Sequence, residues 1–294
     1  MDFEPRKLEF EQAEAIRRLS RQVLSQLELR RRLFEYRKTI EELDRSRSEL
    51  AAEKARTDQL LVNILPASIA DELKRNGKVQ PRYFPAATIL FTDFGFTLLT
   101  EKIEPAALVG LLDQYFTAFD DIVHRCGLEK LKTVGDAYMA VAGVPTASRR
   151  HAIDACLAAL EMQAVVARMK ALREKMRLPA LELRVGLHSG PVMSGVVGKH
   201  KFTFDIWGDA VNTAALMEAN GAPGRINVSE TTAGHVGGLF DLERRGPIVA
   251  KHDRAHEMFF LDRLKPEFSR DPEGRTPNQA FAAECNRLLT GFSG

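Results

Sequence analysis

The sequence predicts an α/β domain with a mixed sheet covered by helices, which follows a long coiled-coil helix. Residues 1–60 carry 27 of the 82 charged residues, 14 basic and 13 acidic, and the first glycine is Gly77. This composition is typical of a long helix. Beyond Pro85, short apolar runs alternate with helical stretches, and this order is typical of a sheet covered by helices. The 294 residues allow one large domain or two of ordinary size.

The first segment carries a regular apolar stripe. From Leu29 to Ile64, stripe positions recur at alternating spacings of four and three residues, which favours a parallel dimeric coiled coil. A single solvated helix packed on the rest of the chain is the alternative. Arg47, Lys54 and Thr57 also occupy stripe positions. They weaken the apolar seam, so we expect a coil that can change register or splay.

Prolines and glycines mark the end of this helix. Pro66 and residues 76–85, with Gly77 and two further prolines, interrupt the helical pattern. We therefore expect a signalling helix, a transducing linker, a main domain and a tail, at residues 1–65, 66–85, 86–265 and 266–294, respectively.

Periodicity predicts the elements of the main domain. Three helices are expected near residues 104–125, 149–176 and 208–219. The expected strands are the apolar runs 87–91, 131–133, 138–141, 181–187, 192–197, 201–206, 225–228 and 258–261.

Composition excludes several classes of protein. The net charge is only +2, from 42 basic and 40 acidic residues, so we expect no nucleic-acid partner. The three cysteines, Cys126, Cys156 and Cys285, are widely spaced and odd in number, which indicates reduced thiols in the cytoplasm and no zinc site. No apolar run approaches 18 residues, so we expect no membrane-spanning segment.

Two aspartates stand out because each follows an apolar strand run among small, flexible residues. They are Asp93, in residues 90–97, and Asp136, in residues 131–138. Carboxylates at neighbouring strand ends are suitable ligands for hard divalent cations. Taken alone, either aspartate is more typical of a turn or a cap than of a metal site. Gly95 and Gly135 allow the backbone to approach a triphosphate closely.

Three stretches together carry a resemblance to a known family. Phe-Thr-Asp-Phe-Gly-Phe-Thr at 91–97, Glu-Lys-Leu-Lys-Thr-Val-Gly-Asp-Ala-Tyr-Met at 129–139 and Phe-Asp-Ile-Trp-Gly-Asp-Ala-Val-Asn at 204–212 resemble the motifs of class III nucleotidyl cyclases. Their order and spacing are also similar to those of the family, over residues 60–265. Leu-Val-Asn-Ile-Leu-Pro at 61–66 resembles the linker that joins coiled coils to these domains.

The resemblance implies a ferredoxin-like catalytic domain that works as a head-to-tail homodimer with its active sites at the interface. It implies that Asp93 and Asp136 of one subunit, with the backbone carbonyl of Phe94, bind two Mg²⁺ or Mn²⁺ ions. These ions would activate the ribose 3′-hydroxyl and bind the triphosphate. The resemblance also places the substrate phosphates against the backbone of Phe94, Gly95, Phe96 and Thr97.

The opposite subunit is expected to choose the base. Lys132 and Asp205 match the family's purine-binding pair, and Asn212 matches the asparagine that orients the ribose. A lysine only donates hydrogen bonds and an ionised aspartate only accepts them, which suits the ring nitrogen and the exocyclic amine of adenine. Guanine would want an acceptor in place of Lys132, so ATP is the expected substrate.

Three departures from the family pattern bear on catalytic competence. Leu216 stands where the family has an arginine that stabilises the transition state, and losing such a donor costs about 100-fold to 1000-fold in turnover. The loop after Asp93 is one residue short. The lysine-rich turn that faces the triphosphate is replaced by residues 250–254, in which Lys251 or Arg254 would have to serve beside Asp253.

We therefore expect a cytoplasmic, dimeric adenylate cyclase that converts ATP to 3′,5′-cyclic AMP and pyrophosphate with reduced activity. Its coiled coil would relay the state of an upstream sensor. Two alternatives remain open: a catalytically silent, cyclase-like nucleotide-binding or regulatory module, and a guanylate cyclase.

Overall fold

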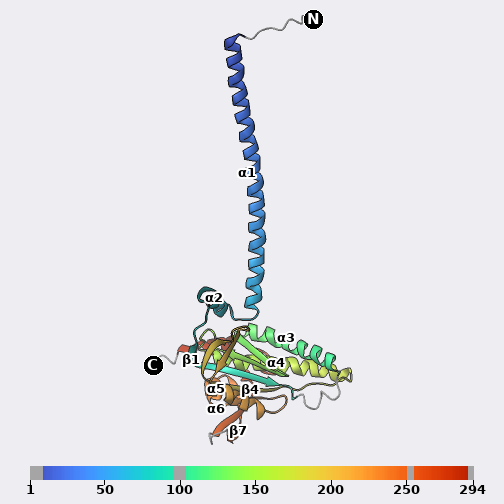
Figure 1. The fold of residues 1–294 in the computed structure, drawn as a ribbon. Helices are drawn as coiled ribbons and strands as arrows, with labels where there is room; N and C mark the ends of the chain where they lie inside the picture. The colour runs from blue at the N-terminus through green and yellow to red at the C-terminus, as the bar shows by residue number, and fades with distance from the viewer. Residues whose placement is uncertain (1–8, 96–103, 250–254, 291–294) are drawn as a thin grey trace. The chain divides into compact units, whose positions relative to one another are not determined.

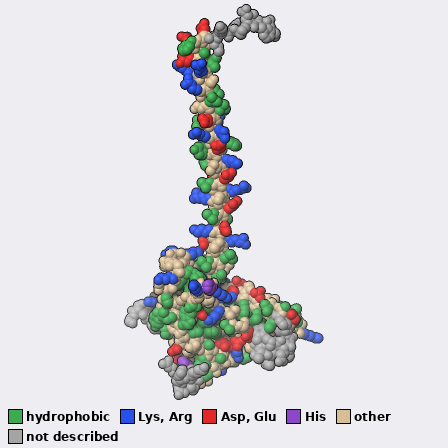
Figure 2. All heavy atoms as spheres, viewed as in Figure 1, with side chains coloured by type: hydrophobic (Ala, Val, Ile, Leu, Met, Phe, Trp, Pro, Cys, Tyr) green, Lys and Arg blue, Asp and Glu red, His purple; other side chains and the backbone are tan. Residues whose placement is uncertain are grey.

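The computed structural model describes residues 9–95, 104–249 and 255–290. The chain divides into two compact units, Met1–Ile64 and Leu65–Gly294. The first unit consists of helix α1, Phe10–Val62, whose 53 residues include no buried side chain. Apolar side chains of the stripe, among them Leu33, Ile40 and Leu43, are more than half exposed, and hydrophobic and charged side chains alternate along the helix (Figure 2). The helix thus presents an apolar surface along about 80 Å.

The second unit is built around a mixed sheet (Figure 1). Its strands lie in the order β2-β3-β1-β4-β6-β8-β7, with β5 paired to β4. The β4–β6 pair is parallel and the others are antiparallel. The strand bounds are β1 Arg82–Asp93, β2 Leu128–Val134, β3 Ala137–Ala142, β4 Arg184–Val197, β5 Thr203–Trp207, β6 Ile226–Ser229, β7 Phe240–Val249 and β8 Ala255–Leu264.

The helices of this unit lie before, between and after the strands. Their bounds are α2 Ala67–Asn76, α3 Pro105–Arg125, α4 His151–Lys175, α5 Asp209–Ala219, α6 Glu230–Val236, the 3₁₀ helix η2 Pro266–Phe268 and α7 Gln279–Thr290. Helices α3 and α4 lie side by side (Figure 1). Among the residues that the structure describes, no helix combines the length and the apolar character needed to cross a membrane.

Alternation along β4 separates the two faces of the sheet, because successive strand side chains point to opposite sides. Val185 and Leu187 are fully buried in the main core with the alanines of α4, and Ser189 bonds to Thr232 of α6. Two residues of the alternate set, Gly186 and Gly190, face α5 instead. Helix α5 therefore packs on one face, and α4 and α6 pack on the other.

The predicted architecture is confirmed, and the three expected helices correspond to α3, α4 and α5. Residues 184–187 of the first expected run and the whole run 192–197 belong to one strand, β4, rather than two, and residues 181–183 precede it. Pro191, between the two runs, lies opposite the irregularity between Phe84 and Ala87 in β1, so its missing N–H costs no ladder bond there. The sequence did not predict β7, α6 or α7.

Helix α5 lies very close to the backbone of β4. A Cβ added to Gly186 would lie 2.0 Å from the backbone nitrogen of Glu218, and one added to Gly190 would lie 3.0 Å from the Cβ of Ala210. Only glycine allows this approach at position 186. The two contacts fix α5 on β4 at both of its ends.

A chain of buried polar side chains crosses the unit between two histidines. His151 Nδ1 lies 2.7 Å from the hydroxyl of Thr88, and His188 Nδ1 lies 2.7 Å from the hydroxyl of Ser229. Hydroxyl-to-hydroxyl contacts of 2.7, 3.0 and 3.3 Å join these ends in the order Thr88, Ser189, Thr232, Ser229. Each of these four hydroxyls therefore has a partner, as burial requires.

Replacing Gly186 by alanine is expected to destabilise this unit by roughly 1–3 kcal/mol, because the new methyl group displaces the backbone of Glu218. The matched control is Gly110→Ala in α3, where an added Cβ meets nothing within 4 Å. This change is expected to stabilise the helix by up to about 1 kcal/mol. Urea unfolding measures both. Equal free energies of unfolding for the two variants would contradict the close β4–α5 approach.

Acid is expected to destabilise the fold through its buried histidines. Burial, assisted by the nearby His235, lowers the pKa of His151 from 6.5 to about 4. The unfolded chain then binds more protons than the folded chain between these pH values, so stability is lost as pH falls from 6.5 towards 4. The loss is up to roughly 3 kcal/mol per histidine. Denaturant unfolding across this range should show a shallower pH dependence for His151→Gln; an unchanged slope would contradict the burial of neutral His151.

Candidate active site

Two aspartates meet at one end of the central strands. Asp93 is the last residue of β1, and Asp136 lies in the turn between Val134 of β2 and Ala137 of β3. Because β3 pairs with β1, with Tyr138 opposite Thr92, this turn comes to lie beside the end of β1. The side chains of Asp93 and Asp136 lie close enough to influence each other's ionisation.

Asp93 is held as an anion despite its partial burial. Burial acts to raise its pKa, but the Gly95 N–H, the neighbouring Asp136 and the Arg184 guanidinium outweigh that effect and lower the pKa below its ordinary value. Gly95 donates to Oδ1 over 2.9 Å, and Arg184 Nη2 donates to Oδ2. Both carboxylate oxygens therefore have a fixed donor.

The chain after Asp93 is anchored by an aromatic cluster. The Phe94 ring is buried, with its centroid 4.8 Å from that of Tyr115 and 6.1 Å from that of Phe119. Its side chain faces the core, which leaves only its backbone for the site. Gly95 follows at a φ of +64°, a conformation that favours glycine. Phe96 and Thr97 lie outside the described residues.

Lys132 and Asp205 lie together in the same chain. Lys132 Nζ is 2.5 Å from Asp205 Oδ2, although the two residues come from β2 and β5. The other carboxylate oxygen, Oδ1, accepts from the backbone N–H of Ile206 over 2.9 Å. The structure thus pairs one pure donor with one pure acceptor on a partly exposed surface.

Helix α5 presents the remaining predicted residue. Asn212 is exposed, and Leu216, one turn later on the same helix face, is half-buried. The nearest arginine in sequence, Arg225, is 2.7 Å from Glu243 and 2.8 Å from Asp262, and it stacks on Phe260. The Arg225 side chain therefore binds these residues and does not replace the arginine expected at position 216. Lys251 and Arg254 lie outside the described residues.

Sequence reasoning missed two residues of this site. Arg184, the first residue of β4, is paired directly opposite Asp93 and also reaches Glu218 of α5, with 3.0 Å between Nε and Oε1. Burial raises the pKa of Glu218, with Arg184 opposing and Asp93 and Asp136 reinforcing that shift. The available signal was a single cation, Arg184, inside the apolar run 181–187.

The residues at this end of the sheet fit a divalent cation. In the described ranges, no group of three or more histidine, cysteine, aspartate or glutamate side chains is arranged to hold a metal. Asp93 and Asp136 instead offer two neighbouring carboxylates. Mg²⁺ is usually bound in this way, by one or two carboxylates with substrate phosphates and water completing its shell.

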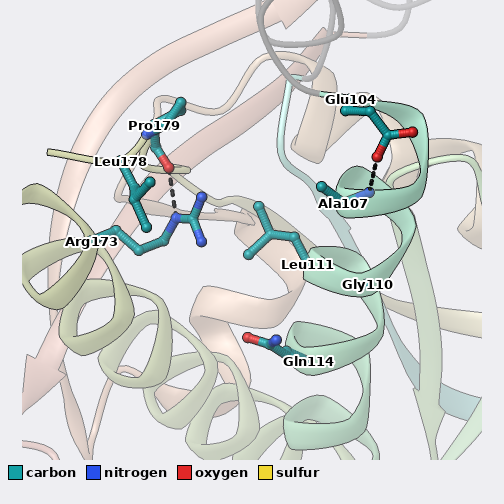
Figure 3. A pocket seen from close by; sticks show the side chains of 8 residues that line it. All are labelled: Glu104, Ala107, Gly110, Leu111, Gln114, Arg173, Leu178 and Pro179. Atoms are coloured by element: carbon teal, nitrogen blue, oxygen red, sulfur yellow. Dashed lines mark hydrogen bonds between the residues drawn. The ribbon is translucent and has the colours of Figure 1, made fainter. Parts of the chain in front are cut away.

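A separate cavity of about 540 Å³ lies between α3 and α4 (Figure 3). Arg173 lines it and donates from Nε to the carbonyl of Pro179 over 2.6 Å, while Glu104 accepts from the N–H of Ala107 over 3.0 Å. None of the predicted site residues lines this cavity. It is therefore distinct from the carboxylate pair and from the Lys132–Asp205 pair.

Comparison with known proteins places this geometry in a family. The model described as the adenylate and guanylate cyclase catalytic domain matches residues 79–263, and a second model, described as haem NO binding associated, matches residues 19–73. Human retinal guanylyl cyclase 1 is 38% identical over 237 residues, which make up 79% of this chain. The chain spans only 21% of that relative's length.

Solved structures agree on the fold. The adenylyl cyclase CyaB from P. aeruginosa is 26% identical with a TM-score of 0.59, over 65% of this chain and all of that one. The catalytic core of a rhodopsin-guanylyl cyclase with converted specificity, in complex with ATPαS, is 28% identical with a TM-score of 0.58, over 62% of this chain and 98% of that one. The chain therefore belongs to the family of adenylate and guanylate cyclase catalytic domains.

Proposed function

We propose that this chain is an adenylate cyclase, which converts ATP to 3′,5′-cyclic AMP and pyrophosphate at the interface of a homodimer. The observation that carries the proposal is the Lys132–Asp205 pair, with 2.5 Å between Nζ and Oδ2. Adenine offers a ring nitrogen that accepts and an amine that donates, so it matches a lysine beside an aspartate. The proposed domain bounds are those expected from the sequence, with the catalytic domain at 86–265.

Each part of the site has a defined task in this reaction. Lys132 and Asp205 of one subunit bind adenine, and Asn212 orients the ribose against Asp93 and Asp136 of the other subunit. The ribose 3′-hydroxyl gives its proton to water, its oxygen bonds to the α-phosphorus, and the bond from that phosphorus to the pyrophosphate oxygen breaks. Mg²⁺ or Mn²⁺, two per site, would supply charge neutralisation and acidify the 3′-hydroxyl. Asp93, already anionic, provides ligand oxygens without a proton to lose.

Exposed apolar surfaces support the dimer. Tyr83 pairs with Met193, and Met193 pairs with Trp207, across β1, β4 and β5. All three side chains are exposed, and directly opposed residues share one face of a sheet. Such a patch is typical of a protein–protein interface. The apolar stripe of α1 would pair with its own copy.

The helix also supports a link to a sensor. The match described as haem NO binding associated spans residues 19–73, which include most of α1. We propose that α1 relays the state of an upstream sensor domain or protein to the catalytic domains. Polar residues in the seam, such as Arg47 and Lys54, leave the coil able to change its packing.

The remaining partner that we propose is ATP, the substrate. We also propose that the protein is located in the cytoplasm.

Two alternatives rest on specific observations. The 38% identity to human retinal guanylyl cyclase 1 favours GTP as the substrate. Leu216, in place of the family's arginine, favours a silent nucleotide-binding or regulatory module. The identity to a guanylyl cyclase does not decide the substrate by itself. A rhodopsin-guanylyl cyclase core with converted specificity was solved in complex with ATPαS, so the cyclase fold accommodates either purine. The choice rests on the side chains that contact the base.

With Mn²⁺, the purified chain is expected to form cyclic AMP from ATP faster than it forms cyclic GMP from GTP. Asp93→Asn or Asp136→Asn should lower the rate by on the order of 100-fold or more, because each removes a carboxylate charge that would hold the cations. Asp241→Asn, at an exposed ion pair with Arg263, is the control. Chromatographic quantification of cyclic AMP and cyclic GMP measures both rates. Preference for GTP would establish the guanylate cyclase alternative. If neither nucleotide gives a product, the proposal that the chain is an active cyclase fails.

Leu216→Arg is expected to raise turnover by roughly 100-fold to 1000-fold, because it restores a cation at the α-phosphate. Insertion of one residue after Phe94 should add to the gain by lengthening the loop. Ala215→Arg, on the neighbouring half-buried position of α5, is the control and should give no gain. Initial rates with Mn²⁺ and ATP test these variants. If neither Leu216→Arg nor the insertion increases the rate, these two departures do not limit the enzyme.

A further inference from the structure

We propose that a second cavity, between α4, α6, α7 and the first half of β1, binds a small molecule with a carboxylate group and an apolar body. The cavity has a volume of about 580 Å³, within the range of about 300–1,000 Å³ that is usual for ligand pockets. None of the predicted site residues lines it. Its strand residues, Pro85 and Ala86, belong to the half of β1 away from Asp93. The inference therefore does not depend on the proposed function.

Much of the cavity wall is apolar. Pro85 of β1, Ile153 of α4 and Leu288 of α7 contribute apolar side chains from three elements. Ala86 and Ala147 are small, so they leave the volume between these elements open. An apolar group that enters the cavity leaves water, which favours binding. An inorganic anion would leave this part of the cavity unfilled, so the ligand needs an apolar body.

The charges around the cavity favour an anion. Arg149 lines the cavity, and none of the described residues that line it is acidic. Asp154, in the first turn of α4, is paired with Arg150 over 3.1 Å. Helix α4 begins at His151, so the positive end of its dipole lies at the same place. A carboxylate on the ligand therefore has favourable electrostatics here.

His151 offers the ligand a buried hydrogen-bonding group. Its side chain lines the cavity, although the residue is only 4% exposed. Nδ1 lies 2.7 Å from the Thr88 hydroxyl. The two ring nitrogens point away from each other, so Nε2 is the nitrogen left for the cavity. Burial lowers the pKa of His151 to about 4, so the ring is neutral at pH 7 and carries one N–H. When Nε2 donates to a ligand oxygen, Thr88 donates to Nδ1.

A second imidazole stands beside the first. His235 of α6 also lines the cavity, and its ring centroid lies 5.4 Å from that of His151, with the ring planes at 75°. An ionised carboxylate has two oxygens that only accept hydrogen bonds. Donors on two imidazoles and on Arg149 suit such a group, and the apolar wall accommodates the rest of the molecule.

The test is isothermal titration calorimetry of the full chain with phenylacetate, at neutral pH and without nucleotide or metal. Phenylacetate has a carboxylate and an aromatic ring. We expect it to bind about 10-fold or more tightly than phenylacetamide, which lacks the charge. It should also bind more tightly than acetate, which lacks the apolar body.

Variants locate the binding site. Ala147→Phe is expected to weaken phenylacetate binding by about 10-fold or more, because the ring fills the cavity. His235→Ala should weaken it by about 3-fold to 10-fold, through the loss of one hydrogen bond. The matched controls are Ala106→Phe in α3 and His200→Ala, at exposed positions outside the cavity. Both controls should bind phenylacetate as the wild type does.

Thermal unfolding of the same variants separates folding from binding. If the wild type does not bind phenylacetate, or if Ala147→Phe and Ala106→Phe bind it equally, the cavity is not the site and the inference is overturned. Equal binding of phenylacetamide and phenylacetate would overturn the carboxylate class. Equal affinities of His235→Ala and His200→Ala would overturn the imidazole contact. If Ala147→Phe does not fold, the comparison of the two histidine variants decides. Cyclase activity does not enter any of these measurements.

Discussion

The carboxylate pair Asp93–Asp136 is the constraint on which the rest of this site depends. Two neighbouring acidic groups at a partly buried strand end are unfavourable unless positive charge or hydrogen-bond donors compensate them. Arg184 and the Gly95 N–H supply part of this compensation, and a divalent cation would supply the remainder. The β1–β3 and β1–β4 registers matter for function because they bring Asp136 and Arg184, respectively, to the end of β1.

Strand β4 connects the two halves of the proposed site. Arg184 begins the strand beside Asp93, and Gly186 brings the backbone of α5 into contact with it. Further along, Gly195 is paired with Asp205 of β5, whose carboxylate holds Lys132. The ends of the strands at Asp93, helix α5 and the Lys132–Asp205 pair, which have the proposed cation-binding, ribose-orienting and base-contacting roles, therefore all take their positions from one strand. A shift in β4 would disturb each of them.

The sequence predicted elements that are rich in apolar side chains and largely buried, such as α3, α4 and β1. It missed β7, because residues 240–249 are rich in charged residues, as is common at the edge of a sheet. Asp93 and Asp136 could be found because they follow apolar runs. The contact between Arg184 and Glu218 joins residues 34 positions apart, and it depends on a close approach at glycine that no local pattern reveals.

Mixing two inactive variants tests the central claim, a site shared between subunits, most directly. One variant carries Asp93→Asn with Asp136→Asn, and the other carries Lys132→Ala with Asp205→Ala. After subunit exchange, half of the dimers pair the two variants, and each such dimer holds one intact site. The account predicts roughly a quarter of wild-type cyclic AMP formation from the mixture and almost none from either variant alone. No product from the exchanged mixture, with an active wild type, would contradict it.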